Sequence, residues 1–235
     1  MINSYFDYIY CLNLDKRVDK WKRVSLHLKS FGIKANRFPA IDGNTKENIR
    51  AYNDIRRRYP TTSKELGKKT IRSPGAYGCL LSHRMIINHA KKHNFRRILI
   101  FQDDVILDKN FNKKFKDKIL KIPKWKLLYL GASQHDWSGV LTSKKPTYNA
   151  WRSQGAFALG MDKSLFDDIL NATEACNIPF DSSISAFIQP AHKGDCHVFY
   201  PNIAIADVSS SDIRKAECNM RDHARLMRWN LNNFQ

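Results

Sequence analysis

Two adjacent carboxylates follow a short apolar run near the middle of the chain. The run spans Ile98 to Phe101, and it ends in Gln102, Asp103 and Asp104. Burying a carboxylate is costly unless an opposite charge or hydrogen bonds compensate it. A divalent cation would do so, because hard cations bind carboxylate oxygens and can bridge them to the phosphates of a ligand. A second interpretation is equally open, in which both acids cap the following turn or pair with nearby lysines.

The element that must position these acids is a buried strand. A continuous apolar run such as Ile98 to Phe101 is typical of a strand that is covered on both faces. Another β-rich run, Tyr8 to Leu14, precedes a segment whose apolar residues recur at helical spacing from Val18 onward. For that helix we expect Asp15 to be the N-cap and Gly32 to be the C′ residue.

Further strands and helices alternate along the chain. The pattern predicts helices over Lys46–Arg58 and from Pro74 to about His93, and strands over Lys126–Gly131 and Ala150–Met161. We expect an irregularity, marked by glycine, within the strand over Ala150–Met161. A long loop is expected over Gly131–Tyr148. This alternation predicts an α/β fold around a largely parallel sheet.

Ligands of such sheets bind beyond the carboxyl ends of the strands. Asn13 to Asp15 and Gln102 to Asp104 both follow predicted strands, so we expect a ligand site there. The motifs GxGxxG and GxxxxGK(S/T) are absent, which leaves the usual dinucleotide-binding and P-loop interpretations without support.

Length and charge narrow the possible classes of protein. The chain has 235 residues, of which 43% are hydrophobic, and this suits one domain with a sizeable core. Its formal net charge of +18 attracts anions such as nucleic acid, nucleotide phosphates, acidic glycans and anionic membranes, without choosing among them. Because the chain has no recognisable nucleic-acid-binding motif, we expect no specific nucleic-acid partner.

The cysteines and the N-terminus indicate a cytoplasmic location. None of the five cysteines forms a CxxC pair, which favours reduced thiols over a disulfide framework or a zinc site. The N-terminus lacks the features of a signal peptide. No apolar stretch approaches the ~20 residues that are needed to cross a bilayer, so we predict no transmembrane segment.

Three segments together resemble the family 25 glycosyltransferases. YIYCLNLDKRVDKW resembles the opening strand of that family with its Asn-Leu, Arg and Asp signature. GAYGCLLSH resembles its Gly-x-x-Gly-Cys-x-x-Ser-His helix start, and ILIFQDDVIL resembles its apolar strand with an acidic metal motif. The order and spacing agree up to about residue 110. Beyond that point QGAFALGMDKSLFDDIL, PFDSSI and VSSSDI agree more loosely.

This resemblance implies both a fold and an activity. The fold would be the glycosyltransferase type A fold, with a Rossmann-like, mostly parallel central sheet flanked by helices. It would form a single domain over residues 1–235, with a nucleotide-binding half at about 1–110 and an acceptor-binding half at about 111–235. The activity would be an inverting hexosyltransferase that uses Mn²⁺ or Mg²⁺ to move a sugar from a UDP-sugar donor to a glycan, lipid-linked glycan or protein acceptor.

The family also includes proteins of giant DNA viruses, and a viral member would work in the host cytoplasm. Neither the sugar, the acceptor, the linkage position nor the oligomeric state follows from the resemblance.

The resemblance also implies roles for individual residues. Asp104 matches the last position of the acidic motif and is the first candidate metal ligand, and His197 is a candidate to complete the metal shell. Arg17 is expected to contact the nucleotide, with Asn13 and Leu14 offering groups near the base. Gln102 and Asp103, at the first two positions of the same motif, complete the expected cofactor-binding residues.

An inverting transferase needs a base that accepts the proton of the acceptor hydroxyl. Asp181 is the first candidate, and its alternative role is to cap the following helix. Asp195, His197 and Asp212 are reserve candidates. His83 lies on the apolar face of its helix, where a histidine is more often a hydrogen-bonded core residue than a ligand.

Two positions depart from the family pattern. Gln102 stands where the family usually has the glutamate of Glu-Asp-Asp, and Ala76 stands where an acidic residue is common. Fewer carboxylates weaken the affinity for hard cations. A second hypothesis is therefore a catalytically weak family member that acts as a scaffold. A third, based on charge alone, is a basic nucleic-acid-binding protein.

Overall fold

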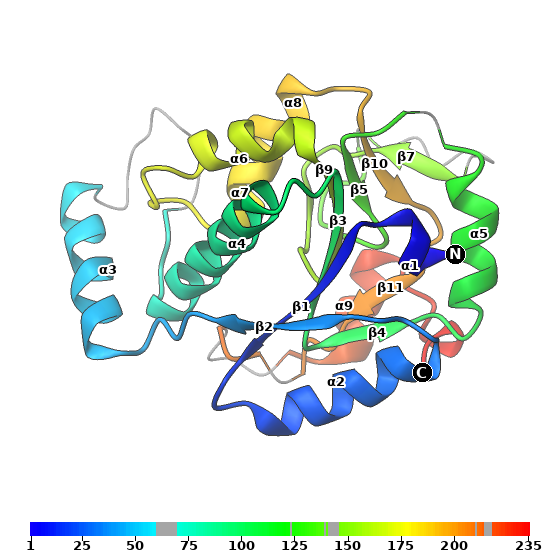
Figure 1. Cartoon of the computed structure of the whole chain (residues 1–235), viewed down its shortest axis with the longest axis horizontal. Coiled ribbons are helices and arrows are strands. Elements are labelled where there is room, and N and C mark those ends of the chain that lie inside the picture. The colour runs from blue at the N-terminus through cyan, green and yellow to red at the C-terminus, as the bar shows by residue number, and fades with distance from the viewer. Residues whose placement is uncertain (60–69, 123, 139, 141–145, 210, 214–217) are drawn as a thin grey trace.

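The computed structural model describes residues 1–59, 70–122, 124–138, 140, 146–209, 211–213 and 218–235. A seven-stranded sheet with the order β2-β1-β3-β9-β5-β10-β7 forms its centre (Figure 1). The strands are β1 (Tyr8–Leu14), β2 (Asn36–Ala40), β3 (Arg97–Gln102), β5 (Leu127–Tyr129), β7 (Thr147–Asn149), β9 (Ala158–Asp162) and β10 (Cys196–Phe199). β2, β1, β3, β5 and β10 run in one direction, and β9 and β7 run against their neighbours. The predicted α/β fold with a mostly parallel sheet is confirmed.

Two small sheets stand beside the large one. β4 (Val105–Leu107) pairs with β11 (Ala204–Ala206), and β6 (Ser133–Gln134) pairs with β8 (Ser153–Gln154). The segment that we predicted as a loop over 131–148 therefore contains β6 and the start of β7. The single strand predicted over 150–161 is divided, because Gly155 adopts a positive φ of 97° between β8 and β9. An L residue rarely adopts that φ, which explains why a glycine marks the break.

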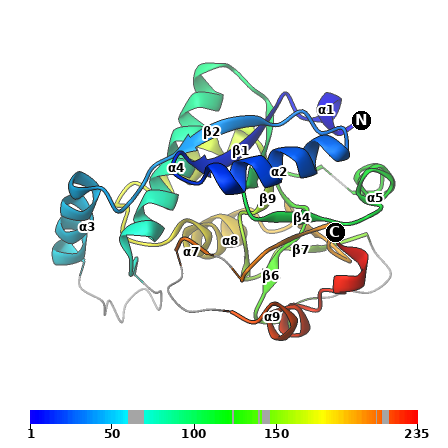
Figure 2. The ribbon, with the colours of Figure 1, turned by 90° about the horizontal axis from the view of Figure 1, so that it is seen from below.

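Helices cover both faces of the sheet (Figures 1 and 2). They are α1 (Ile2–Tyr5), α2 (Val18–Ser30), α3 (Lys46–Arg58), α4 (Pro74–Lys92), α5 (Phe111–Ile119), α6 (Phe166–Ala172), α7 (Phe180–Ser183), α8 (Gln189–Ala191) and α9 (Met220–Met227). A π-helical turn, Ile184–Ile188, joins α7 to α8, and short 3₁₀ turns lie at Lys163–Leu165 and Leu231–Asn233. Within the described ranges, no helix has the length and apolar character that crossing a membrane requires.

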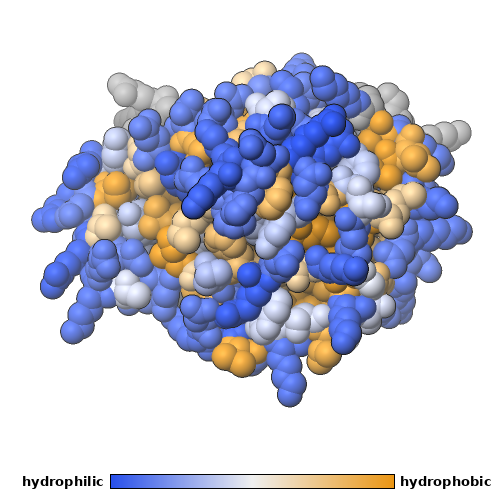
Figure 3. All heavy atoms as spheres, in the orientation of Figure 1, coloured by the Kyte–Doolittle hydropathy of each residue, from blue (hydrophilic) through white to orange (hydrophobic). Residues whose placement is uncertain are grey.

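The two faces of the sheet carry separate hydrophobic cores. Side chains alternate along β3, so Leu99 and Phe101 pack into one core while Ile98 and Ile100 pack into the other. The first core lies under α2 and α5, and the second lies under α4, α6 and α7. All four side chains are fully buried, which explains the uninterrupted apolar run in the sequence. The surface in the view of Figure 3 is mostly hydrophilic, as the composition leads one to expect.

Helix α2 differs from its prediction at its first turn. Arg17 is its N-cap, whereas the predicted N-cap Asp15 is exposed and pairs with Arg37 at 2.8 Å. Val18, expected on the apolar face, is 66% exposed, and Lys20 is buried instead. Gly32 follows the helix with a φ of 69°, so its predicted role as the C′ residue is confirmed.

The first turn of α4 packs closely against the turn that follows β2. A Cβ on Gly78 would lie 2.5 Å from the carbonyl oxygen of Ile41, so no larger residue fits there without movement. Ser82 fastens the same turn, because its hydroxyl accepts a hydrogen bond from the Ile41 amide at 2.8 Å and donates one to the Gly78 carbonyl at 2.7 Å. Ser73 caps the helix by accepting a hydrogen bond from the Ala76 amide at 3.1 Å.

We therefore expect Gly78→Ala to lower the free energy of unfolding by roughly 1–3 kcal/mol, the usual cost of overpacking. Urea unfolding of the variant measures this change. Gly75→Ala, on the same helix, is the matched control, because its Cβ would meet its nearest neighbour at an ordinary 3.4 Å. Equal stability of the two variants would contradict the close contact.

Candidate functional site

The parallel pairing of β1 with β3 brings the polar ends of the two strands together. Leu12 stands opposite Gln102 in this pairing, so Asn13, near the end of β1, lies beside Asp103, which directly follows β3. The Asn13 amide donates a hydrogen bond to Asp103 Oδ2 at 2.6 Å and another to the Arg17 carbonyl at 3.0 Å. Its carbonyl oxygen accepts one from Arg37 Nε at 2.9 Å. Asn13 is therefore held in place on both sides.

A cavity of about 240 Å³ opens beside Asn13, and we call it the Asn13 cavity. Its walls come from the end of β1, the turn after β2, the first turns of α4 and the stretches 102–104 and 211–213. Asn13, Leu14, Gln102, Asp103 and Asp104, all predicted from the sequence, line it together.

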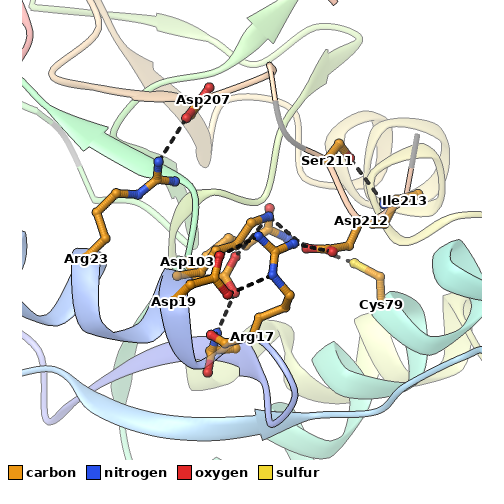
Figure 4. A network of polar contacts seen from close by, with 12 residues as sticks. Arg17, Asp19, Arg23, Cys79, Asp103, Asp207, Ser211, Asp212 and Ile213 are labelled. Carbon is orange, nitrogen blue, oxygen red and sulfur yellow. Dashed lines mark hydrogen bonds and ion pairs between the residues drawn. The ribbon is translucent and has the colours of Figure 1, made fainter. Parts of the chain in front are cut away.

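A group of ion pairs closes one side of this cavity (Figure 4). Arg17 pairs with Asp212 and, at 2.8 Å, with Asp19. Lys20 Nζ lies 2.7 Å from Asp212 Oδ2 and 3.9 Å from Asp103 Oδ1. Burial acts to raise the pKa of Asp212, but hydrogen bonds from Lys20 and Arg17 outweigh it, and the pKa is lowered. Asp212 is therefore a carboxylate at neutral pH.

The environment of Asp104 disfavours the charged form of its side chain. Burial, followed by the charge of Asp103, raises the pKa of its carboxyl group from 3.8 to about 7. Its Oδ1 atom is buried and has no hydrogen-bond partner among the residues that the structure describes. Burial also raises the pKa of Asp103, although the hydrogen bond from Asn13 opposes this. Both acids would gain from an added positive charge.

The two acids fit a hard divalent cation in part. Within the described part of the chain, no three His, Cys, Asp or Glu side chains converge on one point. Mg²⁺-type sites often use one or two carboxylates and take their other ligands from water and substrate phosphates. The buried oxygen of Asp104 that lacks a partner is the atom that such a cation would satisfy. Asp103 and Asp104 are therefore the residues that could hold a cation here.

A second cavity of about 250 Å³ adjoins the first, and we call it the Asp181 cavity. The two cavities share Cys79, Gln102 and Asp104, so they meet at the end of β3. The Gln102 amide lies 3.9 Å from Cys79 Sγ at this junction. Asp181 and the exposed His135 line the second cavity. A ligand in one cavity would therefore face a ligand in the other across Asp104.

Asp181 lies in the first turn of α7 and is not its N-cap. The N-cap is Pro179, so the alternative interpretation of Asp181 as a helix cap is wrong. After burial, the charge of Asp181 is the main cause of the raised pKa of Cys79, which places this carboxylate near the junction of the cavities.

His83 supports the same wall from behind. Its ring stacks on Phe180, with centroids 4.2 Å apart, and its Nδ1 lies 2.8 Å from the Cys79 carbonyl oxygen. Burial lowers the pKa of His83 to about 4, so the ring is neutral at pH 7. As expected, it is a hydrogen-bonded core residue.

The structure does not bring His197 or Asp195 to the acids. His197 is buried within β10 between Leu128 and Asn149, and it lines neither cavity. β10 begins at Cys196, so His197 lies near the start of its strand, whereas Asp104 follows the end of β3. The structure therefore does not support the prediction that His197 is a metal ligand together with Asp104. Asp195 lies 3.5 Å from Lys126, also outside the two cavities.

Sequence reasoning missed Lys20 and Cys79 as site residues. Lys20 belongs to a helix with many lysines, and only its spacing of three residues from Arg17 indicated that the two cations share a side. Cys79 lies among apolar residues of α4, and the glycine before it is the available signal that this turn approaches other backbone.

Comparisons with known proteins show which family this chain resembles. Residues 6–147 match the sequence profile of glycosyltransferase family 25, described as LPS biosynthesis protein. A glycosyltransferase 25 family member of Anopheles gambiae is 26% identical over 127 residues, which make up 53% of this chain and 21% of that protein. Procollagen galactosyltransferase 2 of Mus musculus is 29% identical over 136 residues, 54% of this chain and 21% of its own. The inactive glycosyltransferase 25 family member 3 of Homo sapiens is 28% identical over 138 residues, 55% of this chain and 22% of its own.

The chain thus matches only about a fifth of the length of these relatives. Among solved structures, a glycosyltransferase involved in the glycosylation of the major capsid of PBCV-1 is similar, with a TM-score of 0.51 and 10% identity. The likeness covers 87% of this chain and 93% of that one. It confirms the type A fold expected from the sequence.

The raised pKa of Asp104 predicts a dependence of stability on pH in the metal-free protein. The unfolded carboxyl group loses its proton near pH 3.8, whereas the folded one keeps it until about pH 7. Between these values the folded state binds more protons, so the contribution of Asp104 to stability falls as the pH rises. We expect the melting temperature of Asp104→Asn, measured in EDTA, to exceed that of wild type by an amount that grows from pH 4 to 7 and then stays constant.

Asp136→Asn is the control with the opposite sign. Hydrogen bonds from Ser138 lower the pKa of Asp136, so its contribution is present above pH 3.8 and is lost as the pH falls. That variant should be slightly less stable than wild type at pH 8. A melting difference for Asp104→Asn that does not change with pH would contradict the assigned pKa.

Proposed function

The chain belongs to glycosyltransferase family 25, and from this premise we propose that it is a metal-dependent, inverting hexosyltransferase. Its donor would be a UDP-sugar, and its acceptor a hydroxyl group of a glycan, lipid-linked glycan or protein. One observation carries the proposal: two adjacent cavities meet at Gln102 and Asp104, where β3 ends. Two substrates that react with each other need such an arrangement.

The Asn13 cavity is the proposed donor site. It lies beyond the carboxyl ends of two parallel strands, where α/β folds bind their ligands. Asn13 and Leu14 would contact the nucleoside, and Arg17 would contact the nucleotide from the start of α2. When bound at Asp103 and Asp104, a divalent cation supplies positive charge to the diphosphate leaving group. Gln102 would contribute its amide where related sequences carry an acid.

The Asp181 cavity is the proposed acceptor site. Asp181 would accept the proton of the acceptor hydroxyl while the oxygen of that hydroxyl bonds to the anomeric carbon. The bond between the anomeric carbon and the diphosphate oxygen breaks in the same step, and UDP leaves with the electron pair. Because attack and departure occur on opposite faces of the sugar, the configuration inverts. His83, which is neutral at pH 7, stacks on Phe180 and supports this wall of the cavity from behind.

A weak or inactive family member is the second candidate. Gln102 favours it, because the metal site then has one carboxylate fewer. Relatives described as inactive are also similar to this chain. The two candidates differ in turnover of a nucleotide sugar in the presence of Mn²⁺.

Nucleotide selectivity is the first test. We expect UDP-sugars to raise the melting temperature more than GDP- or CMP-sugars do, because only ligands that bind the folded state stabilise it. A thermal-shift panel with and without Mn²⁺ measures this. Equal shifts for all three nucleotides would reject the uridine assignment.

Substitutions at the two cavities should separate binding from proton transfer. Asp104→Asn should weaken both Mn²⁺ and UDP binding, and turnover should fall as a consequence. Asp181→Asn should leave UDP affinity nearly unchanged and lower turnover by ~10²–10⁴-fold, the usual contribution of a general base. Calorimetry of UDP binding and a transfer assay measure the two effects.

Asp167→Asn is the matched control, since this carboxylate is 73% exposed and, within the described residues, forms an ion pair only with Lys91. It should leave both quantities unchanged. Full activity of Asp181→Asn would assign the base to another residue.

A further inference from the structure

Two cations of one helix converge on a single carboxylate at the edge of the Asn13 cavity. Arg17 pairs with Asp212, as Figure 4 shows. Lys20 binds the same carboxylate, which lies 192 residues beyond it in the sequence. The Lys20 side chain is only 4% exposed, whereas that of Asp212 is 28% exposed. A buried ammonium group is stable only when an opposite charge accompanies it. Asp212 supplies that charge in this structure.

Lys20 lies between Asp212 and the acids at the end of β3. Its ammonium group lies 2.7 Å from Asp212 on one side and 3.9 Å from Asp103 on the other. It therefore stands between the acids that could hold a cation and the stretch 211–213 that lines the cavity. An anion that occupied the place of the Asp212 carboxylate would contact Lys20 and Arg17, and it would lie close to Asp103.

Carboxylate and phosphate oxygens are bound by the same ammonium and guanidinium donors. We propose that Arg17 and Lys20 form the diphosphate-binding pair of the donor cavity, and that Asp212 neutralises them only until the donor binds. The diphosphate then replaces the Asp212 carboxylate on both cations. This inference rests on the proposed function, because it assumes that the cavity receives a nucleotide diphosphate.

The fold indicates which partner moves. Lys20 is buried on a regular helix beside Val24 and Leu28 of the same core-facing side, so its position is set by packing. Asp212 comes from an irregular stretch, and the backbone of this stretch touches α4 only at ordinary distances, such as 3.4 Å between a Cβ placed on Gly75 and the Asp212 carbonyl oxygen. The Asp212 side chain is also the more exposed of the two, so we take Asp212 as the partner that moves.

Thermodynamic linkage predicts the direction in which each substitution changes the affinity for UDP. An interaction that is present in the free protein and absent from the complex lowers the affinity by its own free energy. Removing the Asp212 charge should therefore tighten UDP binding, while removing the Lys20 charge should weaken it. A residue that contacted UDP directly would give the opposite result at position 212.

The experiment is calorimetry of UDP and of uridine with wild type, Lys20→Gln and Asp212→Asn, each in Mn²⁺ and in EDTA. We expect Asp212→Asn to bind UDP roughly 5- to 20-fold more tightly, within the range of ordinary coupling free energies. Lys20→Gln should bind UDP at least about tenfold more weakly in both buffers. Uridine has no phosphate, so its affinity should be the same for all three proteins.

Arg23→Gln is the matched control. Arg23 lies one turn after Lys20 on α2 and also pairs with a C-terminal acid, Asp207 at 3.3 Å, but it lines neither cavity. The Arg23→Gln variant loses the same unit of positive charge as Lys20→Gln. It should leave UDP affinity unchanged if Lys20 contacts the diphosphate, and it should weaken binding equally if only the overall charge of the protein matters. If Asp212→Asn proves too unstable to study, the comparison of Lys20→Gln with Arg23→Gln still decides whether Lys20 holds the diphosphate.

Each outcome has one meaning. Weaker UDP binding by Asp212→Asn would show that Asp212 stays on the ligand, and it would overturn the displacement. Equal affinities for Lys20→Gln and Arg23→Gln would overturn the role of Lys20. In both cases wild type still binds UDP, so the proposed function survives. Failure of wild type to bind UDP in Mn²⁺ would reject the proposed function itself, and the inference with it.

Discussion

The parallel pairing of β1 with β3 is the constraint on which the site depends. It places the ends of two strands next to each other, so Asn13 meets Asp103 at 2.6 Å and Asp104 follows directly. Both acids then sit where burial raises their pKa. The surrounding elements reduce the free-energy cost of burying these two carboxylates. Helix α2 directs Lys20 toward Asp103, and the space beside Asp104 is left open as a cavity instead of being filled by an apolar side chain.

Helix α4 connects the two cavities because its residues repeat with the period of a helix. Gly78 allows its first turn to reach the turn after β2, and Ser82, four residues later, fastens that turn by a hydrogen bond. Cys79 and His83, also four residues apart, lie on the neighbouring stripe, where Cys79 lines both cavities and His83 supports Phe180. One helix thus sets the relative position of the two walls, and a shift of this helix would change both cavities together.

The sequence was most informative where a local pattern determines the structure. The buried strand before the acids, the start of α4 at Pro74 and the C′ glycine of α2 all follow from residue types at fixed offsets, and the structure has them. Local patterns were misleading where tertiary contacts decide. Val18 continued an apolar period but faces solvent, since the ion pairs at the edge of the cavity turn Lys20 inward. His197 has a suitable side chain for a metal, yet its position depends on where β10 begins, and no short segment contains that information. Asp212 and Lys20 are 192 residues apart, so no local sequence pattern around either residue predicts their contact.

The large positive charge of the chain does not by itself explain how the Asn13 cavity would receive an anion. A net charge of +18 acts over the whole surface and is screened beyond about 8 Å at physiological salt. Inside the cavity, Asp42, Asp103, Asp104 and Asp212 stand against Lys16 and Lys20, with Arg17 at its edge. A bare diphosphate would therefore meet at least as many acids as bases. Its entry requires a change in the local charge: a cation bound at the acids, a proton on Asp104, whose pKa of about 7 makes this accessible near neutral pH, or the departure of Asp212. Selectivity for an anion at this site would thus depend on a few groups that can change their charge or position, and the basic surface would bring anions near it.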